Sequence, residues 1–331
     1  MNDFDLKIPQ NELQNDLDST AKFNRDELVR GWRDHEGRTP RVLPAIKFAA
    51  KTDIGQIREN NEDKFDFYEP ERLSVLAARG SLYAVADGVG GALAGQIASE
   101  MMLKNLISGY YDHPAPDLET ALVAAISNAN DRVYGLAQMI PERNGMGTTL
   151  TACVFVEDRV FVAQLGDSRA YLIRDGKIRQ VTQDHSWVEE QVRAGILSRH
   201  DAEQSPFRNV ITRSIGAGPT VQPDLFVEQS QIGDVWVLCS DGLTGYVEDM
   251  EIERIAGSHA PSEAARQLIE LANSRGGRDN ITVFALAVRD LILCNADNES
   301  PTSGVNGTRG AVAVSEADQA ARGGWRKLFG L

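Results

Sequence analysis

The stretch Leu82-Tyr-Ala-Val-Ala-Asp87-Gly88-Val-Gly90-Gly91 decides how this chain is organised. Its apolar first half predicts a short buried strand that ends at Asp87. The glycines that follow allow a sharp turn and a close approach of the backbone to a ligand. A carboxylate beside an exposed backbone carbonyl suits a hard divalent cation, although Asp-Gly taken alone is typical of an ordinary turn.

Further carboxylates stand beside glycine or beside a predicted strand elsewhere in the chain. They are Glu62 and Asp63, Asp167, Asp241 and Asp279. Antiparallel strands can bring such residues to one edge of a layered sheet, where each acid resists ionisation unless a cation joins the group. Ligands that are all oxygen favour Mg²⁺ or Mn²⁺ over zinc. The sequence therefore predicts a site for two divalent ions.

Two such ions could activate a water for in-line attack on phosphorus. A phosphate monoester also needs a cationic partner, and Arg58 lies just ahead of Glu62 in the chain. The fork of its guanidinium group matches phosphate oxygens.

Composition limits the class of protein. The chain has 331 residues, 42% of them hydrophobic, and a net charge of −14, which favours a soluble globular protein and disfavours binding to nucleic acid or to an anionic membrane. No apolar run approaches the ~18 residues of a membrane span. Cys153, Cys239 and Cys294 lack zinc spacing, and no secretory signal stands out, so we expect reduced thiols in a cytoplasmic protein.

The chain divides into a folded region and two tails. Residues 1–44 are polar and predict a flexible extension, and residues 45–290 predict one domain. An irregular segment at residues 186–223 is expected to form a flap over the site. Residues 291–331 read as a linker that ends in Trp325–Leu331, for which we hypothesise a short docking motif.

The central part of the chain predicts an antiparallel sheet. Residues 149–157 and 159–165 are two strands joined by a tight turn, and Asp175-Gly176 joins the strands 169–174 and 177–182 in a hairpin. This pattern excludes a simple doubly wound parallel sheet. Other elements are long helices at 92–110 and after Asp117, a helix that follows the capping box of Ser186 and Glu189, helices at 251–256 and 262–273, and strands at 64–68, 235–240 and 281–288.

The order of motifs resembles the metal-dependent protein phosphatases of the type 2C (PPM) family. The matching stretches run through residues 46–289 in family order: Thr52-Asp-Ile-Gly55-Gln-Ile-Arg58-Glu-Asn-Asn-Glu62-Asp63, Ala84-Val-Ala-Asp87-Gly88-Val-Gly90-Gly91, Met146-Gly147-Thr148-Thr149, Gly166-Asp167-Ser168-Arg169-Ala170-Tyr171, Thr182-Gln-Asp184-His185-Ser186, Leu238-Cys-Ser-Asp241-Gly242-Leu243 and Gly277-Arg278-Asp279-Asn280-Ile-Thr282.

The resemblance implies an α+β fold, a four-layer α-β-β-α sandwich of two antiparallel sheets flanked by helices. It implies that Asp87 bridges two ions, that the Gly88 carbonyl binds one, and that Asp241 and Asp279 are further ligands. Glu62 and Asp63 act in or just behind this ligand shell, Arg58 holds the substrate phosphate, and Asp167 helps to hold a third, weaker ion. Asn280 and Thr148 belong to the same motifs. We expect a monomer that hydrolyses phosphoserine and phosphothreonine in proteins with Mn²⁺ or Mg²⁺ and opposes a Ser/Thr kinase.

Two positions depart from the family pattern. Val89 stands where some members have histidine, so we hypothesise that the proton for the leaving oxygen comes from a metal-bound or ordered water. Gly245 stands where many members have an acid, which leaves open whether the site binds two ions or three.

Rival interpretations are weaker. Cys153 and Arg159 have the spacing of a cysteine phosphatase, but Cys153 lies in a predicted buried strand. Ser168 lacks the second glycine of a nucleophile elbow and precedes a strand. The remaining alternative is a catalytically weak or silent member of the same fold that binds phosphoproteins.

Overall fold

The computed structural model describes residues 38–91, 93–143 and 145–294 of the chain. Two five-stranded sheets form the centre, and every strand pair within them is antiparallel. The first sheet has the order β1 (Val42–Asp53), β12 (Ile281–Leu293), β11 (Val235–Cys239), β8 (Arg169–Arg174) and β9 (Lys177–Gln180). The second has the order β10 (Asp224–Gln229), β7 (Arg159–Leu165), β6 (Leu150–Val156), β3 (Ser81–Ala86) and β2 (Lys64–Tyr68).

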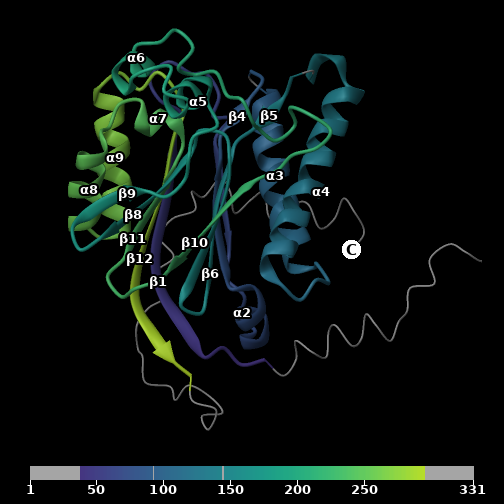
Figure 1. Ribbon diagram of the computed structural model, residues 1–331, viewed down its shortest axis with the longest axis vertical. Coiled ribbons are helices and arrows are strands. Elements are labelled where there is room, and N and C mark those ends of the chain that lie inside the picture. The colour runs from purple at the N-terminus through teal and green to yellow at the C-terminus, as the bar shows by residue number, and fades with distance from the viewer. Residues whose placement is uncertain (1–37, 92, 144, 295–331) are drawn as a thin grey trace, which may run out of the picture.

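Helices cover the outer face of each sheet, so the four-layer α-β-β-α sandwich is confirmed (Figure 1). The long helices on the second sheet are α3 (Leu93–Tyr111) and α4 (Leu118–Met139). Those on the first sheet are α8 (Asp249–Ser258) and α9 (Pro261–Ser274). Short elements lie at the two ends: α2 (Leu73–Arg79), β4 (Gly88–Val89), η1 (Pro141–Arg143), β5 (Gly147–Thr148), α5 (Trp187–Arg193), α6 (Arg199–Glu203) and α7 (Asp241–Thr244).

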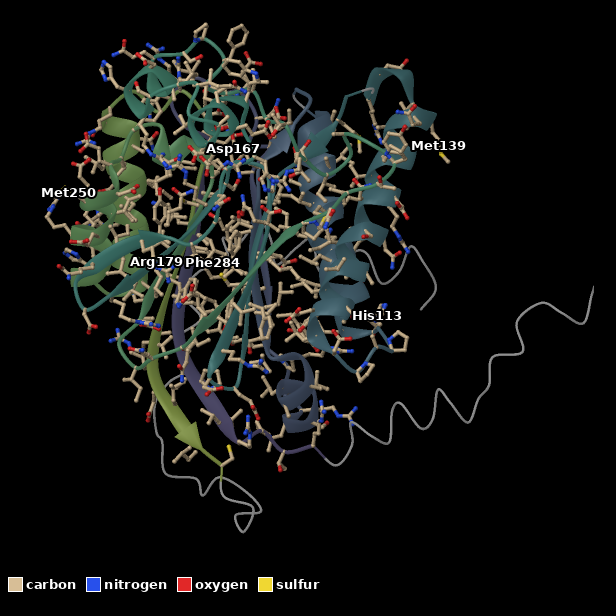
Figure 2. The ribbon with its side chains drawn as sticks, in the orientation of Figure 1. His113, Met139, Asp167, Arg179, Met250 and Phe284 are labelled. Carbon is tan, nitrogen blue, oxygen red and sulfur yellow. The ribbon has the colours of Figure 1, made fainter. Side chains whose placement is uncertain are left out.

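The layer between the two sheets is an apolar core built from inward-facing aromatic and branched residues. Tyr83, Phe155, Trp236 and Phe284 are almost completely buried there, and their rings meet mostly edge to face. Figure 2 shows Phe284 deep between the sheets. Two further apolar clusters lie between each sheet and its own helices. This packing fixes the sheets against each other and leaves the strand ends to form sites.

Local signals in the sequence correctly predicted several elements. Asp175 and Gly176 both have positive φ angles, of 52° and 69°, as a two-residue hairpin turn requires. The Asp117 carboxylate accepts a hydrogen bond from the Thr120 N–H at 2.8 Å and caps α4. Ser186 caps α5 in the same way through the Glu189 N–H.

Other elements differ from the prediction. Strand β12 continues to Leu293 rather than ending at residue 288, because it pairs with β1 along its whole length. Strand β1 begins at Val42, ahead of the expected start of the domain at residue 45. Strand β9 ends at Gln180, two residues earlier than expected, and strand β10 and helix α2 were not predicted.

Most of the predicted N-terminal extension and the segment Trp325–Leu331 lie outside the described residues. Within the part of the chain that the structure describes, none of the helices is long and apolar enough to cross a membrane.

Candidate active site

Strand pairing brings the predicted acidic residues to one end of the sandwich. Asp63 precedes β2 and Asp87 follows β3, and these strands pair with Lys64 opposite Ala86. Asp241 follows β11 and Asp279 precedes β12, and these strands pair with Cys239 opposite Val283. Asp167 lies between β7 and β8, and Figure 2 shows it toward the end of the sandwich that carries α5 and α6.

Burial and mutual repulsion make four of these carboxyl groups hard to ionise: Asp63, Asp87, Asp167 and Asp241. Burial raises the pKa of Asp63 to about 7 and that of Asp167 to about 8, and the charge of Asp241 adds to both effects. Burial, and then the charges of neighbouring acids, raises the pKa of Asp87 well above its usual range. Burial, and then Asp279, also raises the pKa of Asp241. The group therefore favours either bound protons or an added cation at neutral pH.

Two oxygens of this group are buried without a hydrogen-bond partner. They are Oδ1 of Asp63 and Oδ1 of Asp167. The other oxygen of Asp63 accepts a hydrogen bond from the Ser240 hydroxyl at 2.6 Å, which fixes the orientation of the carboxylate. Buried polar atoms nearly always have partners, so an unpartnered carboxylate oxygen points to a ligand site.

Glycines allow the acidic turns to approach one another. A Cβ atom on Gly242 would lie 1.9 Å from the backbone oxygen of Asn280, and one on Gly55 would lie 2.2 Å from that of Asp279. Gly95 in α3 leaves room for the Glu62 carboxylate, whose Oε2 would lie 1.9 Å from an added Cβ. These contacts explain why glycine follows Asp241, and they bring the predicted ligands together.

Arg58 lies at the same end of the molecule and is partly exposed. Its Nη2 donates to Oδ2 of Asp279 at 2.7 Å, and this hydrogen bond raises the pKa of the guanidinium group. Glu62 and Asp87 also lie close enough to act on its charge. The structure thus joins Arg58 to the acidic group, as the sequence suggested, and pairs it with one of the predicted ligands.

Asn280 and Thr148 position the acids through hydrogen bonds. The Asn280 side chain accepts from the Glu62 N–H at 2.8 Å and donates to the carbonyl oxygens of Ile54 and Asn60, both at 3.0 Å. It therefore ties the loop that carries Arg58 to Glu62.

The Thr148 hydroxyl donates to the Asp87 carbonyl oxygen at 2.8 Å. Thr149 binds both backbone groups of Asp87, since its N–H donates to the Asp87 carbonyl at 2.8 Å and its hydroxyl accepts from the Asp87 N–H at 2.9 Å. No sequence pattern indicated the roles of Thr149 and Ser240.

The predicted flap carries α5 and α6 and is tied to the turn that holds Asp167. The His185 N–H donates to the Gly166 carbonyl at 2.8 Å, and Nδ1 of His185 accepts from the Gly166 N–H at 3.2 Å. Nε2 of His185 lies 3.0 Å from Oδ2 of Asp224, which also pairs with Arg213. Burial lowers the pKa of His185, which favours a neutral ring that donates from Nε2.

The carboxylate oxygens of the acidic group suit hard divalent cations, but their side chains are not arranged as a complete metal site. In the three described ranges, no three His, Cys, Asp or Glu side chains are grouped as a ready ion site. Asp279 contacts Arg58 instead, and a hydrogen bond between Asp87 and Asp241 opposes the rise in pKa of Asp241. The residues fit divalent ions because their carboxylate oxygens are the ligands that such ions prefer, and because an ion brings two positive charges where Arg58 brings one.

The cysteine alternative fails on its geometry. Cys153 lies in β6 with no exposed surface, and burial raises its pKa far above the usual range. A thiol in this state cannot act as a nucleophile.

Comparisons with known proteins agree with this arrangement. The sequence profile of the family described as protein phosphatase 2C matches residues 51–281. The serine/threonine protein phosphatase PstP of Mycobacterium tuberculosis is 38% identical over 250 residues, which cover 76% of this chain and 46% of that relative. The chain thus spans about half the length of the mycobacterial protein.

Two further matches cover nearly the whole relative. The serine/threonine phosphatase stp of Listeria monocytogenes is 40% identical over 246 residues, which cover 73% of this chain and 95% of that protein. A crystal structure of the catalytic domain of PstP in complex with two manganese ions has a TM-score of 0.65 and 37% identity, and covers 75% of this chain and all of that one. The chain described here belongs to the protein phosphatase 2C family.

Proposed function

We propose that this protein is a Mn²⁺- or Mg²⁺-dependent phosphatase that hydrolyses phosphoserine and phosphothreonine in proteins. The observation that carries the proposal is the buried acidic group, in which Oδ1 of Asp63 and Oδ1 of Asp167 have no partner. The manganese-bound relative and the names of the matched proteins support the choice of metal and substrate.

The proposed ligands are Asp87, the Gly88 carbonyl, Asp241 and Asp279, with Glu62 and Asp63 in or just behind the ligand shell. Two bound cations would lower the pKa of a water between them and neutralise charge on the phosphoryl group. Thr148 and Thr149 hold the Asp87 peptide, so this residue keeps one orientation while phosphate enters and leaves. Asn280 binds the backbone of Glu62 and of Asn60, and so holds the loop that carries Arg58 next to Glu62.

Arg58 has the proposed role of binding the substrate phosphate. Its Nη2, which donates to Asp279 in the structure, would donate to phosphate oxygens in this role, and Asp279 would serve as a cation ligand. Because Arg58 is about half exposed, it can rotate toward a substrate without leaving the surface of the fold.

The number of ions beyond two depends on Asp167. Gly245 ends α7 and offers no side-chain oxygen, so Asp167 would hold a third ion with fewer protein ligands than many family members provide. We therefore propose weaker binding of this ion than of the other two.

A cytoplasmic monomer that opposes a Ser/Thr kinase is the proposed setting. The free thiols of Cys153 and Cys239 support a reducing compartment. The proposed phosphatase domain lies between an N-terminal extension and a C-terminal linker, and it runs from the start of β1 to the end of β12 (residues 42–293) in place of residues 45–290.

The test is hydrolysis of a phosphothreonine peptide with and without Mn²⁺. We expect metal-dependent turnover by the unaltered chain, a loss of roughly a thousandfold in Asp241→Asn because a ligand is removed, and full activity in Asp131→Asn, which changes an exposed acid on α4. No turnover with metal would leave the silent phosphoprotein-binding alternative. Equal turnover in both variants would mean that the activity does not come from the acidic group.

A further inference from the structure

A buried asparagine lies outside the acidic group and has no part in the proposed chemistry. Asn130 is on α4, the helix that lies outermost on the second sheet in Figure 1. The residue is 1% exposed. Its Oδ1 accepts from the Gly216 N–H at 2.8 Å, and its Nδ2 donates to the Gly218 carbonyl at 3.1 Å. One amide side chain thus binds two backbone groups of the returning part of the flap, residues 210–218, which we name the flap limb.

The flap limb is itself paired with β5. The N–H of Ile215 donates to the Thr148 carbonyl at 2.9 Å, and the Thr148 N–H donates to the Ile215 carbonyl at 3.0 Å. Ile215 is completely buried, and a Cβ atom on Gly147 would lie 2.6 Å from its carbonyl oxygen. The contact therefore has little freedom to slide.

Strand β5 pairs in turn with the backbone at the proposed metal site. Thr148 lies opposite Gly88 in the β4–β5 pair, and its hydroxyl donates to the Asp87 carbonyl oxygen. A continuous series of hydrogen bonds therefore runs from Asn130 through the flap limb and Thr148 to the peptide between Asp87 and Gly88.

The geometry of Gly216 makes Asn130 important for this series. Gly216 has a φ of +84°, and a Cβ atom there would lie 2.8 Å from both the Met146 carbonyl oxygen and a Val133 methyl group. The limb passes Gly216 in a conformation that only glycine adopts readily. The Asn130 side chain binds the Gly216 N–H and the Gly218 carbonyl, and these two hydrogen bonds hold the flap limb in register with β5.

We propose that Asn130 is a positioning residue for metal binding, which it supports by holding the flap limb against Thr148 and so fixing the Asp87–Gly88 peptide. The inference rests on the proposed function, because it assigns those two residues to the metals. When a residue that hydrogen-bonds to a metal ligand from behind is removed, metal affinity or activity typically falls by about 10- to 100-fold.

The test is Mn²⁺ titration calorimetry and amide hydrogen exchange on Asn130→Asp and Asn130→Ala in the full chain. Asn130→Asp keeps the acceptor for Gly216 but loses the donor to Gly218, and Asn130→Ala removes both without adding charge. The matched control is Asn128→Asp, the same change at an exposed position on the same helix. It should leave both measurements unchanged.

We expect an increase of about tenfold or more in the Mn²⁺ dissociation constant of the Asn130 variants, together with faster exchange at the Ile215 and Thr148 amides. Turnover of p-nitrophenyl phosphate and of a phosphopeptide should fall equally at limiting Mn²⁺ and recover at saturating Mn²⁺. A lower Tm with a dissociation constant unchanged within about twofold would reduce Asn130 to a structural role and overturn the proposal, since the predicted loss is at least tenfold.

Failure of the proposed function gives a different result. In that case the unaltered chain shows no Mn²⁺-dependent turnover, whereas the exchange rates at Ile215 and Thr148 still report whether Asn130 holds the limb.

Discussion

Two kinds of buried carboxylate occur in the same β-sandwich. Asp234 is 1% exposed and receives two hydrogen bonds from Arg174, both at 2.7 Å, and Asp184 is paired in the same way with Arg169. Asp63 and Asp167 are buried to a similar degree, but their charged neighbours are mostly other acids, and each keeps one oxygen without a partner.

The difference shows what burial of a charge means in this fold. A buried carboxylate that is paired with an arginine can be part of the stable fold, because the ion pair offsets the cost of removing both charges from water. A group of buried carboxylates that outnumbers its nearby arginines is stable only with bound protons or with an external ion. The first kind should therefore determine folding, and the second should determine activity.

The largest effect is expected in the acidic group that we assign to the metal site. Asp87→Asn should reduce Mn²⁺-dependent turnover by about a thousandfold, equivalent to about 4 kcal/mol, because it removes a shared ligand of both proposed ions. Steady-state hydrolysis of a phosphothreonine peptide measures this loss. Retention of more than a tenth of the activity would mean that Asp87 does not bridge the ions.

The paired group should show the opposite behaviour. Asp234→Ala leaves Arg174 without its partner and should lower the free energy of unfolding by about 2–3 kcal/mol, at or below the low end for a buried pair because Arg174 is 26% exposed. Urea denaturation measures the change. Turnover per folded molecule should stay the same, and a specific loss of turnover would break the division between the two groups.

Arg58 is a cation within the acidic group, and its partner Asp279 is a proposed metal ligand. Arg58→Ala should raise the KM for the phosphopeptide by roughly 10- to 30-fold, which corresponds to the loss of a charge-assisted hydrogen bond of about 1.5–2 kcal/mol. Arg278→Ala, at an exposed arginine next to Asp279, is the control and should leave KM unchanged. An effect on kcat alone would argue against a role in substrate binding.

The smallest expected effect is a pH dependence of stabilisation by metal. Folding raises the pKa of Asp63 from 3.8 to about 7 and that of Asp167 from 3.8 to about 8, so the protonated groups stabilise the fold below about pH 4. This contribution is lost as the pH rises through 7 and 8, where ionised carboxylates bind cations. The increase in Tm on adding Mn²⁺ should therefore be larger at pH 8 than at pH 5, and equal increases would contradict it.

The sequence predicted the parts of this site that local patterns encode. Strands that end in Asp-Gly carry a signal within a few residues, so Asp87 and Asp241 were found, and antiparallel pairing followed from the tight turns around Asp175. Gly242 could have indicated a close approach, because only a residue without Cβ fits against Asn280.

The residues that hold the acids in place could not be predicted in this way. Ser240 reaches Asp63 across 177 positions of sequence, and Asn130 reaches Gly216 across 86. Such contacts depend on tertiary packing and have no period or spacing in the chain. The two-residue strands β4 and β5 were missed for the same reason, because pairing rather than β-propensity defines them.

A Mn²⁺ titration by calorimetry at pH 8, on the unaltered chain, Asp87→Asn and Asp234→Ala, tests whether the acidic group binds the metal. We expect at least two ions to bind to the unaltered chain and to folded Asp234→Ala, and we expect a loss of binding in Asp87→Asn. Mn²⁺ binding that survives in Asp87→Asn but disappears in Asp234→Ala would contradict the assignment of this acidic group to the metal site.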